Sequence, residues 1–287
     1  KLLTGSDNVH VIPTDTVYMT IDKEAVKKSG MMMAADSIPD RMVISLKGKN
    51  ALYKGDLMML EMIDRCNWTR PVYVATTVGQ ENYMNLGDNF VQEGLANRIT
   101  PFTTNAPGAK NFDTKRTYDN MMHKFKYGGL DKPGLYLDET VMRMCYTHRR
   151  LFVQLAMNLM GEGDKTKAAE VLAYADKMIP EYNVPVDFNS GSLDQARLYI
   201  ELGQKAKGMD ILKKLWTKSE QYLKWYCSLG GMRFASAQRD CMLHIFILQQ
   251  AAMDGASADR EWSEKKLKEL DGLVNMYRSK GGTFQGQ

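Results

Sequence analysis

The stretch RRLFVQLAMNLMGEGDKTKAAEVLAYADKMIP, residues 149–180, decides the fold of the second half of the chain. Apolar side chains recur at i, i+3, i+4 and i+7 before its central glycines and again after them: Phe152, Leu155, Ala156 and Leu159, then Ala168, Val171, Leu172 and Ala175. This period predicts two amphipathic helices. Gly161 and Gly163 end the first helix, Asp164 is a suitable N-cap for the second, and Pro180 blocks its continuation. The stretch therefore predicts a helical hairpin.

The spacing within this hairpin resembles the tetratricopeptide repeat (TPR). That repeat has an aromatic residue followed by x2-Leu-small-x2-aromatic, then Ala-x3-aromatic and a proline. Phe152, Leu155 and Ala156 keep the spacing, with Leu159 and Leu172 at positions where the repeat has aromatic residues. The alternative interpretation is a generic helical hairpin.

Two further hairpins are expected downstream. The second is predicted over residues 192–202 and 205–222, with Gly203 at its turn, and the third over residues 233–253 and 263–277. Gly203 follows Gly163 by 40 positions, against 34 in a tetratricopeptide repeat, and the linker after Pro180 accounts for the excess. Two or three hairpins make a short array with a shallow groove.

The first part of the chain mixes strand and helix patterns. Strands are predicted over residues 9–22 (broken near Pro13), 41–47, 70–78 and 90–99, and helices over 23–28, capped by Asp22, and 56–63, capped by Asp56. Strand, helix and strand between 41 and 78 suggest a βαβ-like unit with a parallel pair. The apolar run at 72–75 predicts a strand that is covered on both faces.

These patterns predict an α+β fold class. We expect a mixed α/β module over residues 1–110, a helical linker over 111–147 and TPR-like helical hairpins over 148–287. Within the linker, residues 113–126 have a helical pattern, and Asp138 is placed to cap a long helix that continues into the first hairpin.

Composition narrows the class of protein. Of the 287 residues, 44% are hydrophobic and 25% charged, which are ordinary globular values. The net charge of +4 is spread evenly along the chain, so nucleic acid is a poor candidate partner. No stretch approaches the roughly 20 apolar residues of a membrane span. The chain opens with KLLTGSDN and no signal peptide, which we interpret as the start of an excised domain.

No motif predicts a catalytic residue, a cofactor or a metal. The four histidines, His10, His123, His148 and His244, have no partners at ligand spacing. The cysteines are Cys66, Cys145, Cys227 and Cys241, and they form no C-x-x-C pair. We predict that they are buried free thiols, and one disulfide is the alternative.

Two sets of side chains are candidate binding residues. His148, Arg149 and Arg150 form a basic cluster that could hold an anion such as phosphate, although the favoured interpretation is a solvated helix start that needs no function. Asn158, Gln195 and Tyr199 lie on the first helices of hairpins, which usually line the peptide groove of such an array. They are the candidate residues of a peptide or partner groove.

Several stretches together resemble a known family. They are IPTDTVYMTIDKEAV (12–26), GDLMMLEMI (55–63), NWTRPVYVATTVG (67–79), YDNMMHKFKYGG (118–129) and YLDETVMRMCYTHRRLF (136–152). The chain is similar to the C-terminal soluble region of bacterial multi-pass membrane proteins of unknown function, related to protein O-mannosyltransferase-like (GT-C) glycosyltransferases. The resemblance implies an extracytoplasmic, periplasmic tail, tethered by an upstream transmembrane region. In GT-C enzymes the catalytic acidic residue lies in the membrane domain, so no catalytic residue carries over.

Three functions follow as expectations. The first is an accessory domain that is non-catalytic by itself and positions acceptor protein or partner subunits, with its own transmembrane domain as a partner. The second is a free-standing hydrolase or transferase, with a site near the carboxyl ends of strands 41–47 and 70–78. The third is a TPR-type protein-interaction scaffold.

Overall fold

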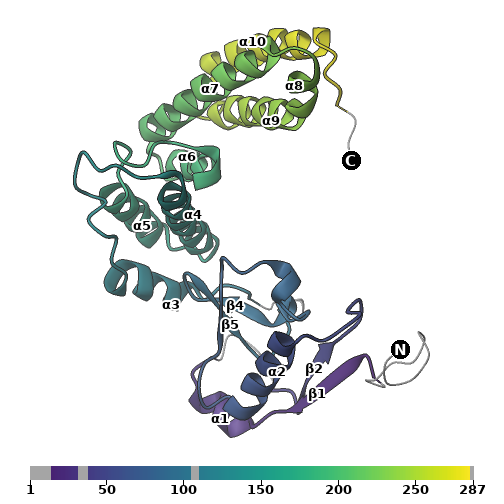
Figure 1. The fold of residues 1–287 in the computed structure, drawn as a ribbon. Coiled ribbons are helices and arrows are strands. Elements are labelled where there is room, and N and C mark those ends of the chain that lie inside the picture. The colour runs from purple at the N-terminus through teal and green to yellow at the C-terminus, as the bar shows by residue number, and fades with distance from the viewer. Residues whose placement is uncertain (1–13, 32–37, 105–109, 285–287) are drawn as a thin grey trace, which may run out of the picture. The chain divides into compact units, whose positions relative to one another are not determined.

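The structure, a computed structural model, describes residues 14–31, 38–104 and 110–284 and divides into two compact units, Lys1–His123 and Lys124–Gln287. The first unit contains two small sheets with short helices, and the second is helical (Figure 1). The predicted α+β class is confirmed. Each unit is described by itself below.

The first sheet is an antiparallel pair. Strand β1 (Thr16–Thr20) pairs with β2 (Arg41–Ser45) in the register Val17↔Ile44 and Met19↔Met42. Helix α1 (Lys23–Lys28) lies between them in sequence, and the Asp22 carboxylate caps it as predicted, accepting from the N–H groups of Glu24 and Ala25. One face of the sheet is buried at Met19, Met42 and Ile44, while Tyr18 and Val43 are exposed on the other, because side chains alternate along a strand. The part of the 9–22 prediction before residue 14 lies outside the described residues.

Helix α2 (Lys54–Cys66) begins earlier than predicted. Its N-cap is Tyr53, and Asp56 stands at the third helical position, where its carboxylate accepts the N–H of Tyr53 at 2.9 Å. The prediction that Asp56 is the N-cap is therefore wrong, although its carboxylate does satisfy a backbone group at the helix start. Leu60 and Ile63 pack into the core of the first unit.

The second sheet contradicts the predicted βαβ unit. Strands β3 (Tyr73–Ala75), β4 (Phe90–Gln92) and β5 (Ala96–Ile99) form an antiparallel sheet in the order β3-β5-β4. β2 and β3 belong to different sheets, because β1 is the partner of β2 and β5 is the partner of β3. The expected parallel pair is absent from the described strands, and with it the edge on which the hydrolase or transferase site was predicted.

Two smaller strand predictions were also wrong. The run at 72–75 is not covered on both faces, since Tyr73 and Ala75 are exposed in β3. The single strand predicted over 90–99 is two strands that reverse direction near Gly94, whose φ of 92° suits a glycine. Two 3-10 turns, η1 (Gln80–Asn82) and η2 (Gly87–Asn89), precede β4.

The helix predicted over 113–126 is shorter in the structure. Asp113 caps α3 (Thr114–Asp119) by accepting the N–H of Arg116 at 2.9 Å, and a π-helical turn (Asn120–Lys124) follows.

The second unit begins with the predicted hairpin. The Asp138 carboxylate caps α4 (Glu139–Gly161), which continues as one helix into the opening stretch, and Asp164 caps α5 (Lys165–Met178). All eight apolar residues of the two predicted faces are buried. A long helix leading into a helical hairpin is therefore confirmed, while the assignment to the tetratricopeptide class stays a prediction.

The later helices pair as predicted, although their first and last residues differ from the predicted bounds. Helix α6 (Ser192–Glu201) pairs with α7 (Lys205–Ser228), and a 3-10 turn, η4 (Phe188–Ser190), precedes α6. The helix predicted over 233–253 is divided at Ala237 into α8 (Gly231–Ser236) and α9 (Gln238–Gly255), and α9 packs on α10 (Arg260–Ser279). No helix within the described ranges is long and apolar enough to span a bilayer. All four cysteines are buried free thiols, as predicted.

Candidate binding pocket

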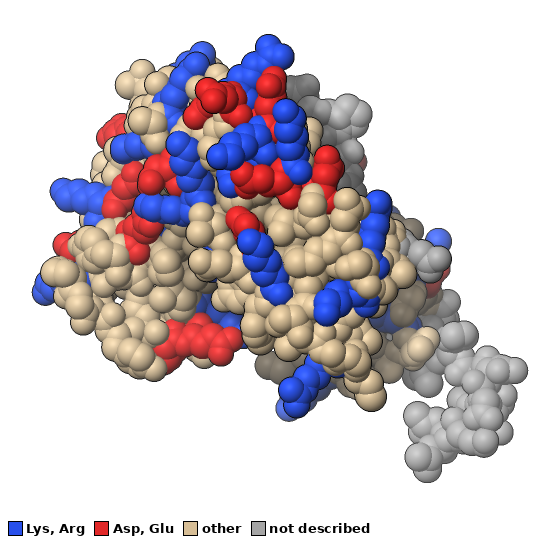
Figure 2. Space-filling model, turned by 90° about the horizontal axis from the view of Figure 1, so that it is seen from above, with Lys and Arg blue, Asp and Glu red and all other residues tan. Residues whose placement is uncertain are grey.

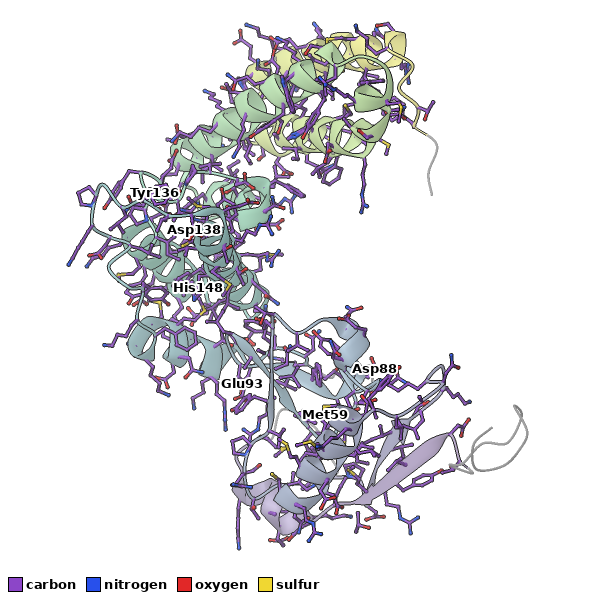
Figure 3. The ribbon with its side chains drawn as sticks, in the orientation of Figure 1. Met59, Asp88, Glu93, Tyr136, Asp138 and His148 are labelled. Carbon is purple, nitrogen blue, oxygen red and sulfur yellow. The ribbon has the colours of Figure 1, made fainter. Side chains whose placement is uncertain are left out.

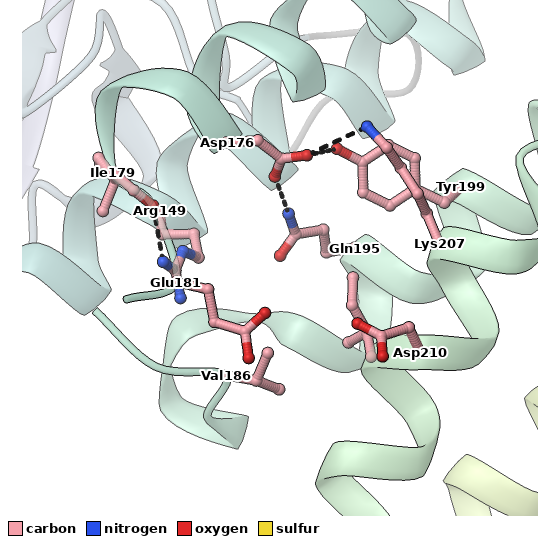
Figure 4. Close-up of a pocket in the computed structure, with 10 residues that line it drawn as sticks. Arg149, Asp176, Ile179, Glu181, Val186, Gln195, Tyr199, Lys207 and Asp210 are labelled. Atoms are coloured by element: carbon pink, nitrogen blue, oxygen red, sulfur yellow. Dashed lines mark hydrogen bonds and ion pairs between the residues drawn. The ribbon is translucent and has the colours of Figure 1, made fainter. Parts of the chain in front are cut away.

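A pocket lies in the helical unit, between the first hairpin and the second (Figure 4). Its volume is about 280 Å³, and its lining combines buried polar side chains with charged side chains at its rim. The lining residues come from α4, α5, the segment after α5, α6 and α7: Arg149, Asp176, Ile179, Glu181, Val186, Gln195, Tyr199, Lys207, Asp210 and Ile211.

One carboxylate organises the pocket wall. Asp176, near the end of α5, accepts a hydrogen bond of 2.5 Å from the Tyr199 hydroxyl and one of 3.1 Å from the Gln195 amide, both on α6. The ammonium of Lys207, on α7, lies 3.4 Å from the same carboxylate and 5.0 Å from the centre of the Tyr199 ring. A single side chain thus connects three helices. Burial, and then the charge of Asp176, raise the pKa of Tyr199, so its hydroxyl keeps its proton and acts as a donor.

The guanidinium of Arg149 forms another part of the wall. It is 5% exposed and donates to the carbonyl oxygens of Ile179 at 2.8 Å, Val184 at 2.6 Å and Pro185 at 3.1 Å. Burial lowers its pKa, and the nearby charges of Asp176 and Glu181 oppose that change. Arg149 holds the segment after α5 in place and leaves a positive charge beside the pocket.

The rim carries both signs of charge. Lys214 lies 2.7 Å from the carboxylates of both Glu181 and Asp210, and these side chains are 41–59% exposed. Exposed ion pairs of this kind contribute little to stability. A polar ligand that has donors, acceptors and charges of both signs fits this rim better than a polyanion does.

The predicted groove residues divide between two places. Gln195 and Tyr199 line the pocket, and their side chains are buried against Asp176. Asn158 is absent from the pocket lining and donates to the carbonyl oxygen of Gln154 on its own helix at 2.9 Å. Their role as peptide ligands stays a prediction.

The predicted anion cluster also divides. Arg149 lines the pocket, whereas Arg150 is exposed. The Nδ1 atom of His148, which is labelled on α4 in Figure 3, lies 2.8 Å from the carbonyl oxygen of Met144. The three side chains leave the helix in different directions because successive residues turn by about 100°. Anion binding by the cluster stays a prediction.

Sequence reasoning missed Asp176, Lys207, Asp210 and Glu181. For Asp176 a signal was present: it stands four positions after Leu172 and directly after Ala175, so it borders the apolar face of its helix. A carboxylate at that border must find partners when the helix packs.

A second polar cluster lies in the first unit, around Glu93 (labelled in Figure 3). The Glu93 carboxylate accepts from the Tyr73 hydroxyl at 2.6 Å and pairs with Arg98 at 3.4 Å and Arg116 at 3.5 Å. The two guanidiniums also donate to the carbonyl oxygens of Ser29 at 3.3 Å and Gly30 at 2.6 Å. The cluster connects the end of α1, the second sheet and α3, so these contacts stabilise the packing of the first unit.

Charge and metal-ligand patterns add no further site. On the face shown in Figure 2, Lys and Arg side chains lie among Asp and Glu side chains without a broad patch of one sign. Within the part of the chain that the structure describes, no group of three or more His, Cys, Asp or Glu side chains is arranged to hold a metal ion.

Residues 1–118 match the family model of the TMEM260-associated domain 2. This part of the chain is therefore similar to a domain that is associated with TMEM260. It does not include the helical unit, in which the pocket lies. No curated protein and no solved structure matches the chain. The relation to O-mannosyltransferase-like enzymes and the bacterial source stay predictions.

Proposed function

We propose that this chain is an extracytoplasmic accessory region of a membrane glycosyltransferase-like protein. It is non-catalytic by itself, and its helical unit binds a polypeptide segment of an acceptor protein or partner subunit. The match of residues 1–118 to a domain associated with a membrane protein supports the accessory role. The observation that carries the binding role is the pocket between the hairpins.

The chemistry of the pocket suits a polypeptide. A peptide segment presents amide donors, carbonyl acceptors and side chains of either charge. The pocket lining offers Lys207, Glu181 and Asp210, and Lys214 pairs with both of these carboxylates from outside the lining. The fixed wall of Arg149, Asp176 and Tyr199 keeps the pocket formed before the ligand arrives, which reduces the ordering cost of binding.

Binding is tested with the full chain and an array of overlapping peptides from the membrane region that we expect upstream and from secreted proteins of the same organism. Affinities of the retained peptides are then measured by fluorescence anisotropy. We expect Lys207→Ala to weaken binding about tenfold, or about 1.4 kcal/mol. Lys213→Ala is the matched control, because it removes the same charge from an exposed position of α7 outside the pocket lining. Equal affinities for the two variants would exclude the pocket as the binding site.

Location is tested separately. The complete gene is expressed with a tag inserted within the region of residues 1–287, directly after Gln287, and protease is added to spheroplasts. We expect loss of the tag together with recovery of the untreated protein in the membrane fraction. A tag that is protected until the membrane is dissolved contradicts the extracytoplasmic location and leaves the binding test unaffected.

The paired helices also favour a second candidate, a protein-interaction scaffold that acts without a membrane domain. The α4–α5 and α6–α7 hairpins support it. It predicts peptide binding in the first experiment and recovery of the full-length gene product in the soluble fraction in the second.

A further inference from the structure

Two cysteines lie at the same end of a tightly packed helix pair. Cys227 is the penultimate residue of α7, and Cys241 lies in the first turn of α9. The short helix α8 connects the two, so the chain reverses and brings the end of α7 beside the start of α9. Both side chains belong to one hydrophobic core, with exposures of 2% for Cys227 and 0% for Cys241.

The two thiols also interact. Burial raises the pKa of both, that of Cys241 to about 12, and the neighbouring Cys227 thiol adds to the rise at Cys241. The thiols are therefore protonated in the folded protein. The other two cysteines belong elsewhere: Cys66 lies in α2 of the first unit, and Cys145 lies in α4.

We propose that Cys227 and Cys241 form a disulfide that joins α7 to α9 when the chain folds in an oxidising compartment. The location proposed above is such a compartment for many secreted proteins. The thiol pair seen in the structure is then the reduced form of this site.

The reaction is a thiol–disulfide exchange with a disulfide oxidant, either oxidised glutathione or a protein oxidoreductase. One cysteine thiolate attacks the oxidant and forms a mixed disulfide, and the second cysteine displaces the oxidant's remaining thiol. The cysteine pair loses two electrons and two protons, and the oxidant is reduced to two thiols. Because the thiolate is the nucleophile, buried protonated thiols react slowly, and the bond forms before the core closes around them.

The first experiment maps the bond. The reduced, denatured full chain is refolded with oxidised and reduced glutathione, digested with trypsin without reductant, and analysed by mass spectrometry. We expect the peptides 225–233 and 240–260 to be joined, with the loss of two hydrogen atoms. Four free thiols in the refolded protein, or other pairings at equal abundance, would overturn the proposal.

The second experiment measures what the bond does. The closed loop runs from residue 227 to residue 241, which is 15 residues. A crosslink across a loop of this length is expected to raise the Tm of the helical unit by about 6–12 °C relative to the reduced protein. Cys227→Ala and Cys241→Ala should each abolish the dependence of Tm on reductant, while Cys66→Ala and Cys145→Ala preserve it.

These comparisons separate the effect of the disulfide from the effect of each substitution and from the cellular location of the chain. Each variant is compared with itself in the presence and absence of reductant, so the cost of a cavity at a buried alanine cancels. An unchanged Tm in a protein with the mapped bond would contradict the stabilising role. The refolding does not depend on where the chain resides in the cell, so its result is independent of the location test.

Discussion

At the scale of single residues, three neighbours with similar chemistry have different surroundings. His148, Arg149 and Arg150 look like one basic cluster in the sequence, yet Arg149 is buried and Arg150 is exposed. The helix turns each side chain toward a different environment, and Arg149 donates to the carbonyl oxygens of Pro185 and Val184 in the segment after α5. A basic run within a helix is therefore weak support for an anion site, because its members point apart.

Arg149→Met is expected to destabilise the helical unit by about 2–4 kcal/mol, because the carbonyl oxygens of Ile179, Val184 and Pro185 lose their donor. Urea unfolding followed by circular dichroism measures the change. Arg150→Met is the matched control and should change the free energy of unfolding by no more than about 0.5 kcal/mol. Similar costs for the two variants would show that the carbonyl contacts are not what Arg149 contributes.

At the scale of the elements, close approach of α6 and α7 depends on Gly208. A Cβ atom there would lie 2.5 Å from Cγ1 of Ile200 and 2.7 Å from the carbonyl oxygen of Ala196. We expect Gly208→Ala to destabilise the helical unit by about 1–3 kcal/mol, despite alanine's better helix propensity. Gly272→Ala in α10, where nothing lies within 4 Å, should instead stabilise it by about 0.5–1 kcal/mol. The same sign for both variants in thermal unfolding would contradict this explanation.

The start of α5 should respond to pH through its cap. Lys167 lowers the pKa of Asp164, first through its side-chain ammonium and then through its backbone N–H. Because the folded-state pKa lies below the unfolded value of about 3.9, the stabilisation is present above that pH and is lost as the pH falls through the folded-state pKa.

We therefore expect an NMR titration to place the Asp164 carboxyl below its ordinary pKa, and Lys167→Gln to move the pKa back upward. Asp164→Asn keeps a cap acceptor but cannot titrate, so its stability should lack this acid-dependent contribution. An Asp164 pKa that is unchanged in Lys167→Gln would show that the ammonium group of Lys167 is not the cause.

At the scale of the whole molecule, the chain divides after His123. The core of the first unit draws on residues between Val17 and Phe102, and the core around α7, α9 and α10 lies wholly in the second. We expect fragment 124–287 to fold alone, because it contains a complete hydrophobic core of its own. Its amide NMR spectrum should overlay that of the intact chain, and a collapsed spectrum would contradict the prediction.

The sequence by itself determined the features that depend on near neighbours. The helical period of residues 149–180, its glycine turn, its Asp164 cap and the buried side of each helix all follow from residues three or four apart. The same reasoning located β1 and β2 and chose Gln195, Tyr199 and Arg149, which line the pocket.

Only the tertiary structure decided which distant segments meet. β2 and β3 looked like one parallel pair, but hydrogen bonding to β1 and β5 places them in separate sheets. Asp176 joins Gln195, Tyr199 and Lys207 across 19 to 31 positions of sequence. The spacing of apolar residues within one element does not predict these contacts, because the contacts depend on how the apolar faces of several elements pack together. The hairpin at residues 149–180 could therefore be predicted from the sequence. The pocket beside it forms only because this hairpin packs against the second one.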